Sequence, residues 1–269
     1  MNSVESGHAV RTAPVYEVLA ADIKSLGVEA VFGLMSDDTA LFVTALDMVG
    51  ITFHGGRHEN AAISMAEGYA YASGSLGIAV VGRGPATANG LHAAVYAART
   101  GSRVLIIYGD AAFGTSSTNA LGPDYKAFNA LGVLTAAGLQ VLRATSAAGA
   151  RTTLADAAGL AMQGNAVALL LPTSIQLSKL EWDDADPAPS VVVAETRAES
   201  ARPEAVQSAV DCLGRSQRPL IIAGLGAHRA GAREALEQLA DQIGAMLLTT
   251  ARAKEMFRGH PYQIGIIGS

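Results

Sequence analysis

The amino-acid sequence predicts an α/β fold, a doubly wound, mostly parallel sheet with helices on both faces. Short apolar runs alternate with amphipathic helical stretches from residue 14 to about residue 180. Strands that are apolar along their whole length are typical of parallel sheets, in which helices cover both faces and right-handed crossovers join the strands. Only 5% of the residues are aromatic, and alanine and glycine are abundant. This composition favours close packing of helices on the sheet.

The expected elements follow one another in a regular order. A helix repeats its apolar side chains every three to four residues, whereas a buried strand is a short apolar run bounded by turn residues. The first part of the chain has helices over 14–28, 37–50, 59–74, 86–100 and 150–164, and strands over 29–33, 51–55, 77–82, 103–109, 139–145 and 166–172. The alternation resumes with helices over 202–216 and 230–244 and strands over 218–224 and 245–250.

Two domains and a linker are expected. Residues 1–180 form the first domain. Residues 181–200 carry acidic side chains, two prolines and no helical stripe, which is typical of a linker. Residues 201–269 are interpreted as the beginning of a second, incomplete Rossmann-like α/β domain, because this length is short for a doubly wound fold.

Composition and charge exclude several classes of partner. The net charge is −5 and no lysine or arginine cluster is present, so we expect small molecules as partners and neither nucleic acid nor a membrane. Cys212 is the only cysteine, which excludes an intrachain disulfide framework and predicts a buried thiol. No apolar run reaches the roughly 18 residues of a membrane span, and residues 1–14 lack the apolar core of a signal peptide. A cytoplasmic location is therefore expected.

Glu59 breaks the polarity pattern of its helix. If that helix begins near His58, a rotation of about 100° per residue puts Glu59 on the apolar side, together with Ala62, Ile63, Ala66 and Ala70. A buried carboxylate costs several kcal/mol unless it is paired or protonated, and a group in that position is suited to proton transfer. The alternative is that Glu59 only caps the first helical turn, where free N–H groups favour a carboxylate.

Three segments around this position resemble a known family. "GVEAVFGLMSDD", "GGRHENAAISMAEGYAYASG" and "IAVVGRGPATANGLHAAVYAARTGSRVLIIYG" are similar, in order and spacing, to the pyrimidine-binding domain of thiamine diphosphate-dependent enzymes of the acetolactate synthase, 2-oxo-acid decarboxylase and 2-hydroxyacyl-CoA lyase type. The resemblance covers roughly residues 12–180, and the remainder resembles the start of that family's central domain. It implies that Glu59 is catalytic, binding N1′ of the cofactor's aminopyrimidine and activating the cofactor by proton exchange.

The resemblance also implies further cofactor contacts. Gly84, Pro85 and Asn89 belong to a Gly-Pro turn and its downstream asparagine, which in the family pack against the pyrimidine ring. An ordinary strand-to-helix turn is the alternative for this segment. Met35 stands in the strand-end loop "FGLMSDD", where the family usually has proline, and is a further expected cofactor contact.

Four residues are implied as substrate contacts. Asp37 aligns with an acidic residue used for proton transfer in pyruvate decarboxylase-like members, although capping of the helix that follows is the interpretation favoured by its residue type. Arg83 replaces the small or hydroxyl residue expected before the Gly-Pro turn. Tyr125 and Phe128 fall where related enzymes place a loop over the active site, and Lys126 between them could also reach substrate; a solvated loop is the alternative.

The implied cofactor site is only partly contained in this sequence. In the family, Mg²⁺ and the diphosphate are held by another domain with a Gly-Asp-Gly…Asn motif, and "YGDAAFG" does not match it, so no metal ligand is expected here. A diphosphate-binding domain or subunit would complete the site in a homodimer or tetramer. The implied chemistry is decarboxylation, carboligation or 2-hydroxyacyl lysis of a 2-oxo-acid or 2-hydroxyacyl substrate. The chain would be a fragment, one subunit of a split enzyme, or a remnant without catalysis.

The segment "IIAGLGAHRAGA" supports a rival interpretation. It follows a predicted strand and precedes a predicted helix, and Gly224, Gly226 and Gly231 give it the look of a loosened dinucleotide fingerprint. The central domain of some related enzymes binds FAD or ADP, so either ligand is an expectation for this segment. A non-catalytic nucleotide-binding or regulatory module therefore stands as the alternative function.

Overall fold

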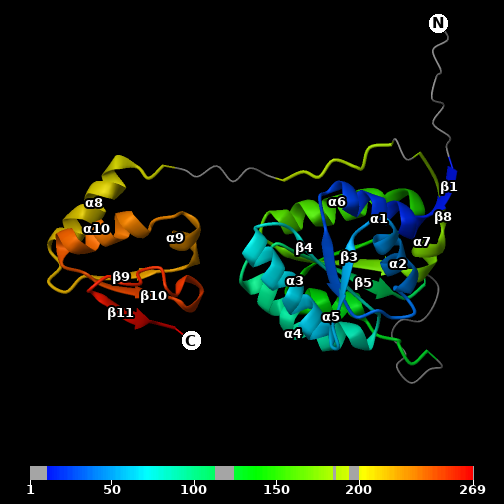
Figure 1. The fold of residues 1–269 in the computed structure, drawn as a ribbon, viewed down its shortest axis with the longest axis horizontal. Coiled ribbons are helices and arrows are strands. Elements are labelled where there is room, and N and C mark those ends of the chain that lie inside the picture. Colours follow the sequence, from blue (N-terminus) through cyan, green and yellow to red (C-terminus); the bar gives the residue numbers. More distant parts are fainter. Residues whose placement is uncertain (1–10, 113–123, 184–185, 194–199, 269) are drawn as a thin grey trace, which may run out of the picture. The chain divides into compact units, whose positions relative to one another are not determined.

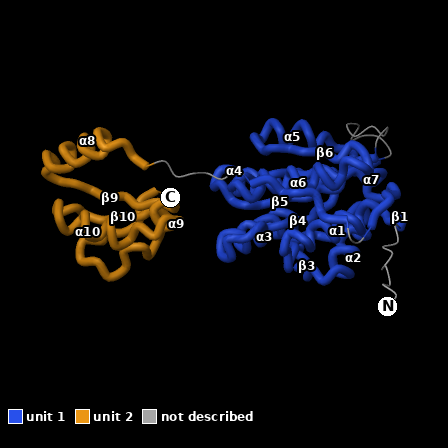
Figure 2. The backbone as a smooth tube through the Cα atoms, turned by 90° about the horizontal axis from the view of Figure 1, so that it is seen from above, with its two compact units in different colours: residues 1–195 blue, residues 196–269 orange. Residues whose placement is uncertain are grey.

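The chain folds into two compact units, residues 1–195 and residues 196–269 (Figure 2). A computed structural model describes residues 11–112, 124–183, 186–193 and 200–268. Within these ranges no helix has the length and apolar character needed to cross a membrane.

Unit 1 is built on a six-stranded sheet in which every strand runs parallel to its neighbours, in the order β3-β2-β4-β5-β7-β6. Figure 1 shows helices above and below this sheet. The strands are β2 (Ala30–Gly33), β3 (Thr52–Gly55), β4 (Gly77–Val81), β5 (Val104–Asp110), β6 (Gln140–Arg143) and β7 (Ala166–Pro172). β4, β5 and β7 are buried at every position, because helices cover both faces of the sheet. The predicted doubly wound α/β class is confirmed.

Alternate residues of the central strands serve two separate cores. In β4, Ile78 and Val80 face the first core, whereas Ala79 and Val81 face the second. The helices of the first core are α1 (Val15–Ser25), α2 (Ala40–Met48) and α6 (Ala147–Met162), and those of the second are α3 (Glu59–Ser73), α4 (Pro85–Arg99) and α5 (Ala130–Ala136). Large aliphatic side chains dominate the first core and alanines the second.

Small residues bring α3 and α4 close together. A Cβ on Gly90 of α4 would lie 2.6 Å from Cδ1 of Ile63 in α3 and 3.6 Å from Cβ of Glu59. The first distance is shorter than carbon atoms tolerate, so a side chain at residue 90 would force the end of the Ile63 side chain to move. The close approach sets the start of α3 against the first turns of α4.

Some elements of unit 1 have no periodic signal in the sequence. β1 (Arg11–Pro14) pairs antiparallel with β8 (Lys179–Trp182), so β8 takes in the first two residues of the predicted linker. Residues 186–193 have no regular secondary structure, although Val191 packs against the first core. α5 occupies the end of a segment expected as a loop, and α7 (Thr173–Leu177) is too short to show a helical period.

Unit 2 contains a smaller parallel sheet in the order β11-β10-β9. Its elements are α8 (Pro203–Gly214), β9 (Leu220–Ala223), α9 (Leu225–Arg229), α10 (Arg233–Ile243), β10 (Met246–Thr249), the 3₁₀ helix η1 (Ala251–Ala253) and β11 (Gln263–Ile266). Leu247 and Phe257 anchor its core. The prediction that Cys212 is buried is wrong, because α8 has no buried residue and Cys212 is exposed on it.

Candidate active site

The candidate site lies at the edge of the sheet where the parallel strands of unit 1 end. From β2 the chain moves outward to β3 and then returns to the other side of β2 to form β4. Such a reversal leaves a crevice beyond the carboxyl ends of the two strands, which is where open α/β sheets bind ligands. A cleft of about 270 Å³ is found there, lined by Leu34, Met35, Ser36, Glu59, Gly82, Arg83, Pro85, Ala86, Tyr125 and Lys126. We call it the Glu59 cleft.

Glu59 is the first residue of α3 and is only 9% exposed. The N-cap of this helix is His58, whose Nδ1 accepts a hydrogen bond from the backbone N–H of Asn60 at 3.1 Å. Glu59 is buried together with the four apolar residues of the stripe predicted from the 100° rotation. Its Oε2 accepts a hydrogen bond from Nδ2 of Asn89 in α4 at 3.1 Å. The carboxylate thus lies in the first turn and on the buried face at the same time.

The turn between β4 and α4 depends on Gly84, which has φ 67° and ψ −116° and serves as the N-cap of α4. A Cβ at this position would lie 2.3 Å from the backbone oxygen of Lys126. Pro85 occupies the first helical position, where its missing N–H carries no penalty. The turn therefore brings Pro85 and Ala86 to the cleft wall and packs Gly84 against the backbone of Lys126.

Among the described residues, two cations line the cleft, and both are ion-paired. Nζ of Lys126 donates to Oγ of Ser36 at 3.1 Å, to Oδ1 of Asp38 at 2.7 Å and to Oδ1 of Asp37. The guanidinium of Arg83 donates through Nη1 and Nη2 to the two carboxylate oxygens of Asp124, at 2.8 and 3.1 Å.

The backbone N–H of Arg83 also donates to Oδ2 of Asp38 at 2.6 Å. The loops after β2 and β4 and the segment 124–126 are therefore tied into one network.

The charges of the network shift its pKa values in consistent directions. The hydrogen bond from Lys126 holds the pKa of Asp37 well below its usual range, and the bond from Arg83 lowers the pKa of Asp124. Partial burial alone would lower the pKa of Lys126, but its bonds to Asp37 and Asp38 outweigh burial and raise it. The bond to Asp124 raises the pKa of Arg83. Both cations are thus charged at neutral pH.

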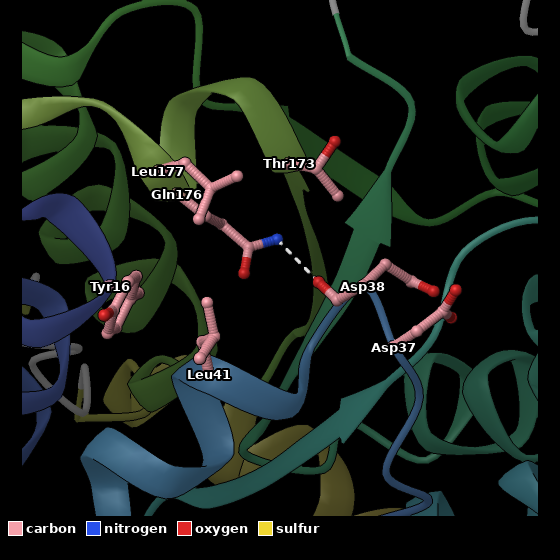
Figure 3. Close-up of a pocket in the computed structure, with 7 residues that line it drawn as sticks. All are labelled: Tyr16, Asp37, Asp38, Leu41, Thr173, Gln176 and Leu177. Carbon is pink, nitrogen blue, oxygen red and sulfur yellow. Dashed lines mark hydrogen bonds between the residues drawn. The ribbon is translucent and has the colours of Figure 1, made fainter.

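The prediction that Asp37 caps the following helix is wrong. α2 begins at Ala40 with Thr39 as its N-cap, because residues 36–39 first form a turn in which the N–H of Thr39 donates to the oxygen of Ser36 at 3.0 Å. Asp37 lines a separate pocket of about 80 Å³, with Tyr16, Asp38, Leu41, Thr173, Gln176 and Leu177. Figure 3 shows Gln176 donating to the backbone oxygen of Asp38, at 3.0 Å, with both carboxylates pointing away from Gln176.

The structure brings most of the expected site residues together. Met35, Arg83, Pro85 and Tyr125 line the cleft with Glu59, and Asn89 joins them through its hydrogen bond. Phe128 packs against the alanine-lined core and does not line the cleft. The site-residue predictions missed Ser36, Asp38 and Asp124, whereas Lys126 belongs to the loop that was expected over the active site. Their charged or polar side chains in predicted loops were the available signal, but nothing in the sequence shows which of these residues pair with each other.

Comparisons with known proteins identify the family. A model described as thiamine pyrophosphate enzyme, N-terminal TPP binding domain, matches residues 14–131. A second, described as thiamine pyrophosphate enzyme, central domain, matches residues 206–269. The chain belongs to the thiamine pyrophosphate enzyme family.

Relatives of this thiamine pyrophosphate enzyme chain are distant. It is 27% identical to "Probable acetolactate synthase large subunit" of Methanococcus aeolicus, with 94% of the chain and 42% of the relative covered. It is 24% identical to the acetolactate synthase of Arthrospira platensis, over 79% of the chain and 36% of the relative. It is 23% identical to human 2-hydroxyacyl-CoA lyase 1, over 93% of the chain and 43% of the relative. The chain spans less than half the length of these relatives.

Two further motifs were singled out in the sequence, one in each unit. Asp110 of "YGDAAFG" pairs with Nε of Arg143 at 2.7 Å, and the described part of the chain contains no group of acidic, histidine or cysteine side chains able to hold a metal. In unit 2 the glycine-rich loop opens α9, a helix of only five residues that ends before α10 begins.

Proposed function

We propose that this chain is the N-terminal part of a thiamine diphosphate-dependent lyase or transferase that makes or breaks a C–C bond next to a carbonyl. The reaction is decarboxylation of a 2-oxo acid, carboligation or 2-hydroxyacyl lysis. The observation that carries the proposal is the position of Glu59, an almost buried carboxylate that lines a cleft at the switch point of the sheet. The names of the acetolactate synthase and 2-hydroxyacyl-CoA lyase relatives support this range of chemistry.

The residues of the cleft fit the aminopyrimidine part of thiamine diphosphate. Asn89 is the one hydrogen-bond donor to the Glu59 carboxylate within the described ranges, so acceptor positions remain for a second donor. Leu34, Met35, Pro85 and Ala86 provide apolar wall beside the carboxylate, as a flat heteroaromatic ring requires.

In this function Glu59 holds a proton at N1′ of the aminopyrimidine and exchanges it during the reaction. Asn89 orients the carboxylate from α4, and the turn at Gly84 and Pro85, together with Met35, would provide wall for the ring. The bound cofactor supplies the nucleophilic carbon and the electron sink for the change in the C–C bond. Partial burial keeps water from competing for the Glu59 carboxylate.

The proposal also needs a site for the cofactor's diphosphate and Mg²⁺, which the Glu59 cleft does not supply. A diphosphate-binding domain or subunit supplies the Mg²⁺ site, and a homodimer or tetramer brings it to the Glu59 cleft. Asp37 and Tyr125 remain proposed substrate contacts, whereas Phe128, packed against the alanine-lined core, would need to move to reach the cleft. FAD or ADP at the loop after β9 remains a proposal, and the cytoplasm is the proposed compartment.

Exchanging Glu59 for glutamine tests the function. In the complete enzyme, with its diphosphate-binding part present, Glu59→Gln should lower cofactor-dependent turnover of a 2-oxo acid by about 10²- to 10⁴-fold, the usual contribution of a positioned acid or base. The matched control is Glu67→Gln on the same helix, where Oε1 accepts a hydrogen bond from Ser102 at 2.7 Å outside the cleft. That variant should retain turnover within about twofold.

Calorimetry distinguishes the proposal from the rival nucleotide-binding module. Thiamine diphosphate with Mg²⁺, FAD, ADP and NAD are titrated separately into the complete protein. Binding of thiamine diphosphate that weakens in Glu59→Gln supports the proposal. Binding of a nucleotide alone, unchanged by that substitution, favours the non-catalytic module.

A further inference from the structure

Arg83 lines the Glu59 cleft and has hydrogen-bond donors that no described residue uses. A guanidinium carries five N–H groups in a planar fork. Asp124 takes two of them, one on Nη1 and one on Nη2, and no other side-chain hydrogen bond joins Arg83 to the described residues. The Nε–H and the second hydrogens of Nη1 and Nη2 are therefore available along the free edges of the fork.

Lys126, the other cation of the cleft wall, has no such capacity. An ammonium group has three donors, and those of Lys126 are directed at Ser36, Asp37 and Asp38. Of the two cations that line the cleft, only Arg83 can bind a further acceptor without losing a partner it already has.

The surroundings of Arg83 favour an anion over a neutral acceptor. Its side chain is 21% exposed, so solvent screens its charge only partly. Asp124 binds the guanidinium end-on and fixes its plane, which removes the entropy cost of orienting the long side chain when a ligand arrives. A carboxylate placed on a free edge would form charge-assisted hydrogen bonds, which are stronger than neutral ones.

Arg83 is better suited to bind a substrate carboxylate that does not react than the carboxylate that is lost. The carboxylate lost in a decarboxylation becomes less charged as the reaction proceeds. A guanidinium bound to it would stabilise the starting state more than the transition state and slow the reaction. A terminal carboxylate keeps its charge throughout, so its binding energy holds the reacting end in position at no such cost.

We propose that Arg83 is the specificity-determining residue of the Glu59 cleft and binds a second, terminal carboxylate of the substrate. The favoured substrates are then 2-oxo dicarboxylates, not 2-oxo acids with an alkyl tail. Asp124 acts as a positioning residue that orients the guanidinium. This inference rests on the proposed function, since it concerns the substrate of the same cleft.

The test compares two substrates of similar size in the complete enzyme. 2-Oxoglutarate carries the terminal carboxylate, and 5-methyl-2-oxohexanoate has a branched alkyl end in its place. Wild-type enzyme should show the higher kcat/KM with 2-oxoglutarate. Arg83→Gln should lower that kcat/KM by roughly 10- to 100-fold, as expected for loss of charged hydrogen bonds, and change the value for the alkyl substrate by no more than about threefold.

Controls separate this inference from the proposed function. Arg103→Gln removes an arginine just before β5, at the opposite edge of the sheet, where it donates to the oxygen of Gly74 at 2.8 Å, and should leave both kcat/KM values unchanged. Calorimetry of glutarate with the 269-residue chain adds a readout without turnover, and its binding should be lost in Arg83→Gln.

If Arg83→Gln affects both substrates equally, or if wild type prefers the alkyl substrate, the role of Arg83 is refuted while the enzymatic function stands. Absence of turnover with every 2-oxo acid would refute the inference, and absence of turnover with 2-hydroxyacyl substrates as well would remove the proposed function too.

Discussion

Gly84→Ala should destabilise unit 1 far more than an ordinary glycine substitution. The backbone of Gly84, at φ 67° and ψ −116°, lies outside the regions open to L-residues, which costs about 1–3 kcal/mol. The new Cβ would also meet the backbone oxygen of Lys126 at 2.3 Å, and a backbone atom cannot rotate away, so displacement adds about 1–3 kcal/mol. After subtraction of the entropy gained from the stiffer unfolded chain, the expected loss is about 2–5 kcal/mol.

Urea unfolding followed by tryptophan fluorescence measures this loss. Trp182 is the only tryptophan and is buried in unit 1, so its emission reports that unit. The matched control is Gly74→Ala, at the C-terminal cap of α3 with φ 72° and ψ 3°, where a Cβ would meet nothing within 4 Å. That substitution should cost about 1 kcal/mol from backbone strain alone. Equal losses in the two variants would refute the contact between the Gly84 turn and Lys126.

Other perturbations test interactions elsewhere in unit 1. Arg151→Met should cost about 3–5 kcal/mol of unfolding free energy in urea melts, because it leaves the buried Asp22 without the partner that lies at 2.8 Å; Asp22→Leu added to it should recover most of the loss, and no recovery would contradict the pairing. The pKa of Asp37 is lower in the folded state than in the unfolded chain, so its ionised carboxylate stabilises the fold at pH values above the ordinary pKa of 3.8. This stabilisation is lost as the pH falls from 3.8 through the lowered pKa of the folded state. Carboxyl NMR titration should show the pKa of Asp37 rising in Lys126→Met, and an unchanged titration would rule out the ion pair. Tyr108→Phe should leave the free energy of unfolding in urea unchanged or raise it, because the buried hydroxyl has no hydrogen-bond partner in the described part of the chain. A fall in that free energy of more than about 1 kcal/mol would show that the hydroxyl has a partner.

The sheet and the position of Glu59 follow from short-range patterns. β4, β5 and β7 are apolar at nearly every position, which predicts strands buried on both faces. The burial of Glu59 with its apolar neighbours follows from helical rotation alone, since helix geometry fixes which residues share a face.

The network beside Glu59 could not be predicted in the same way. Arg83 and Asp124 are 41 residues apart, and Ser36 and Lys126 are 90 apart, so only the folded sheet brings them together. The cap assigned to Asp37 failed for a local reason, because the turn over residues 36–39 delays the helix and turns the carboxylate toward Lys126. Pairing of this kind depends on tertiary distance, which spacing in the sequence does not encode.

Because neighbouring residues of β4 face unlike cores, this strand should tolerate exchanges of side chain better than a change of length. Deleting one residue at the start of β4 would turn Ile78 and Val80 toward the second core, which is lined by alanines, and Ala79 toward the first core. The second core would then be overpacked and the first would contain a cavity. The same slip would pull Arg83 out of its place at the strand end. The number of residues in β4 therefore determines where the Arg83 guanidinium lies.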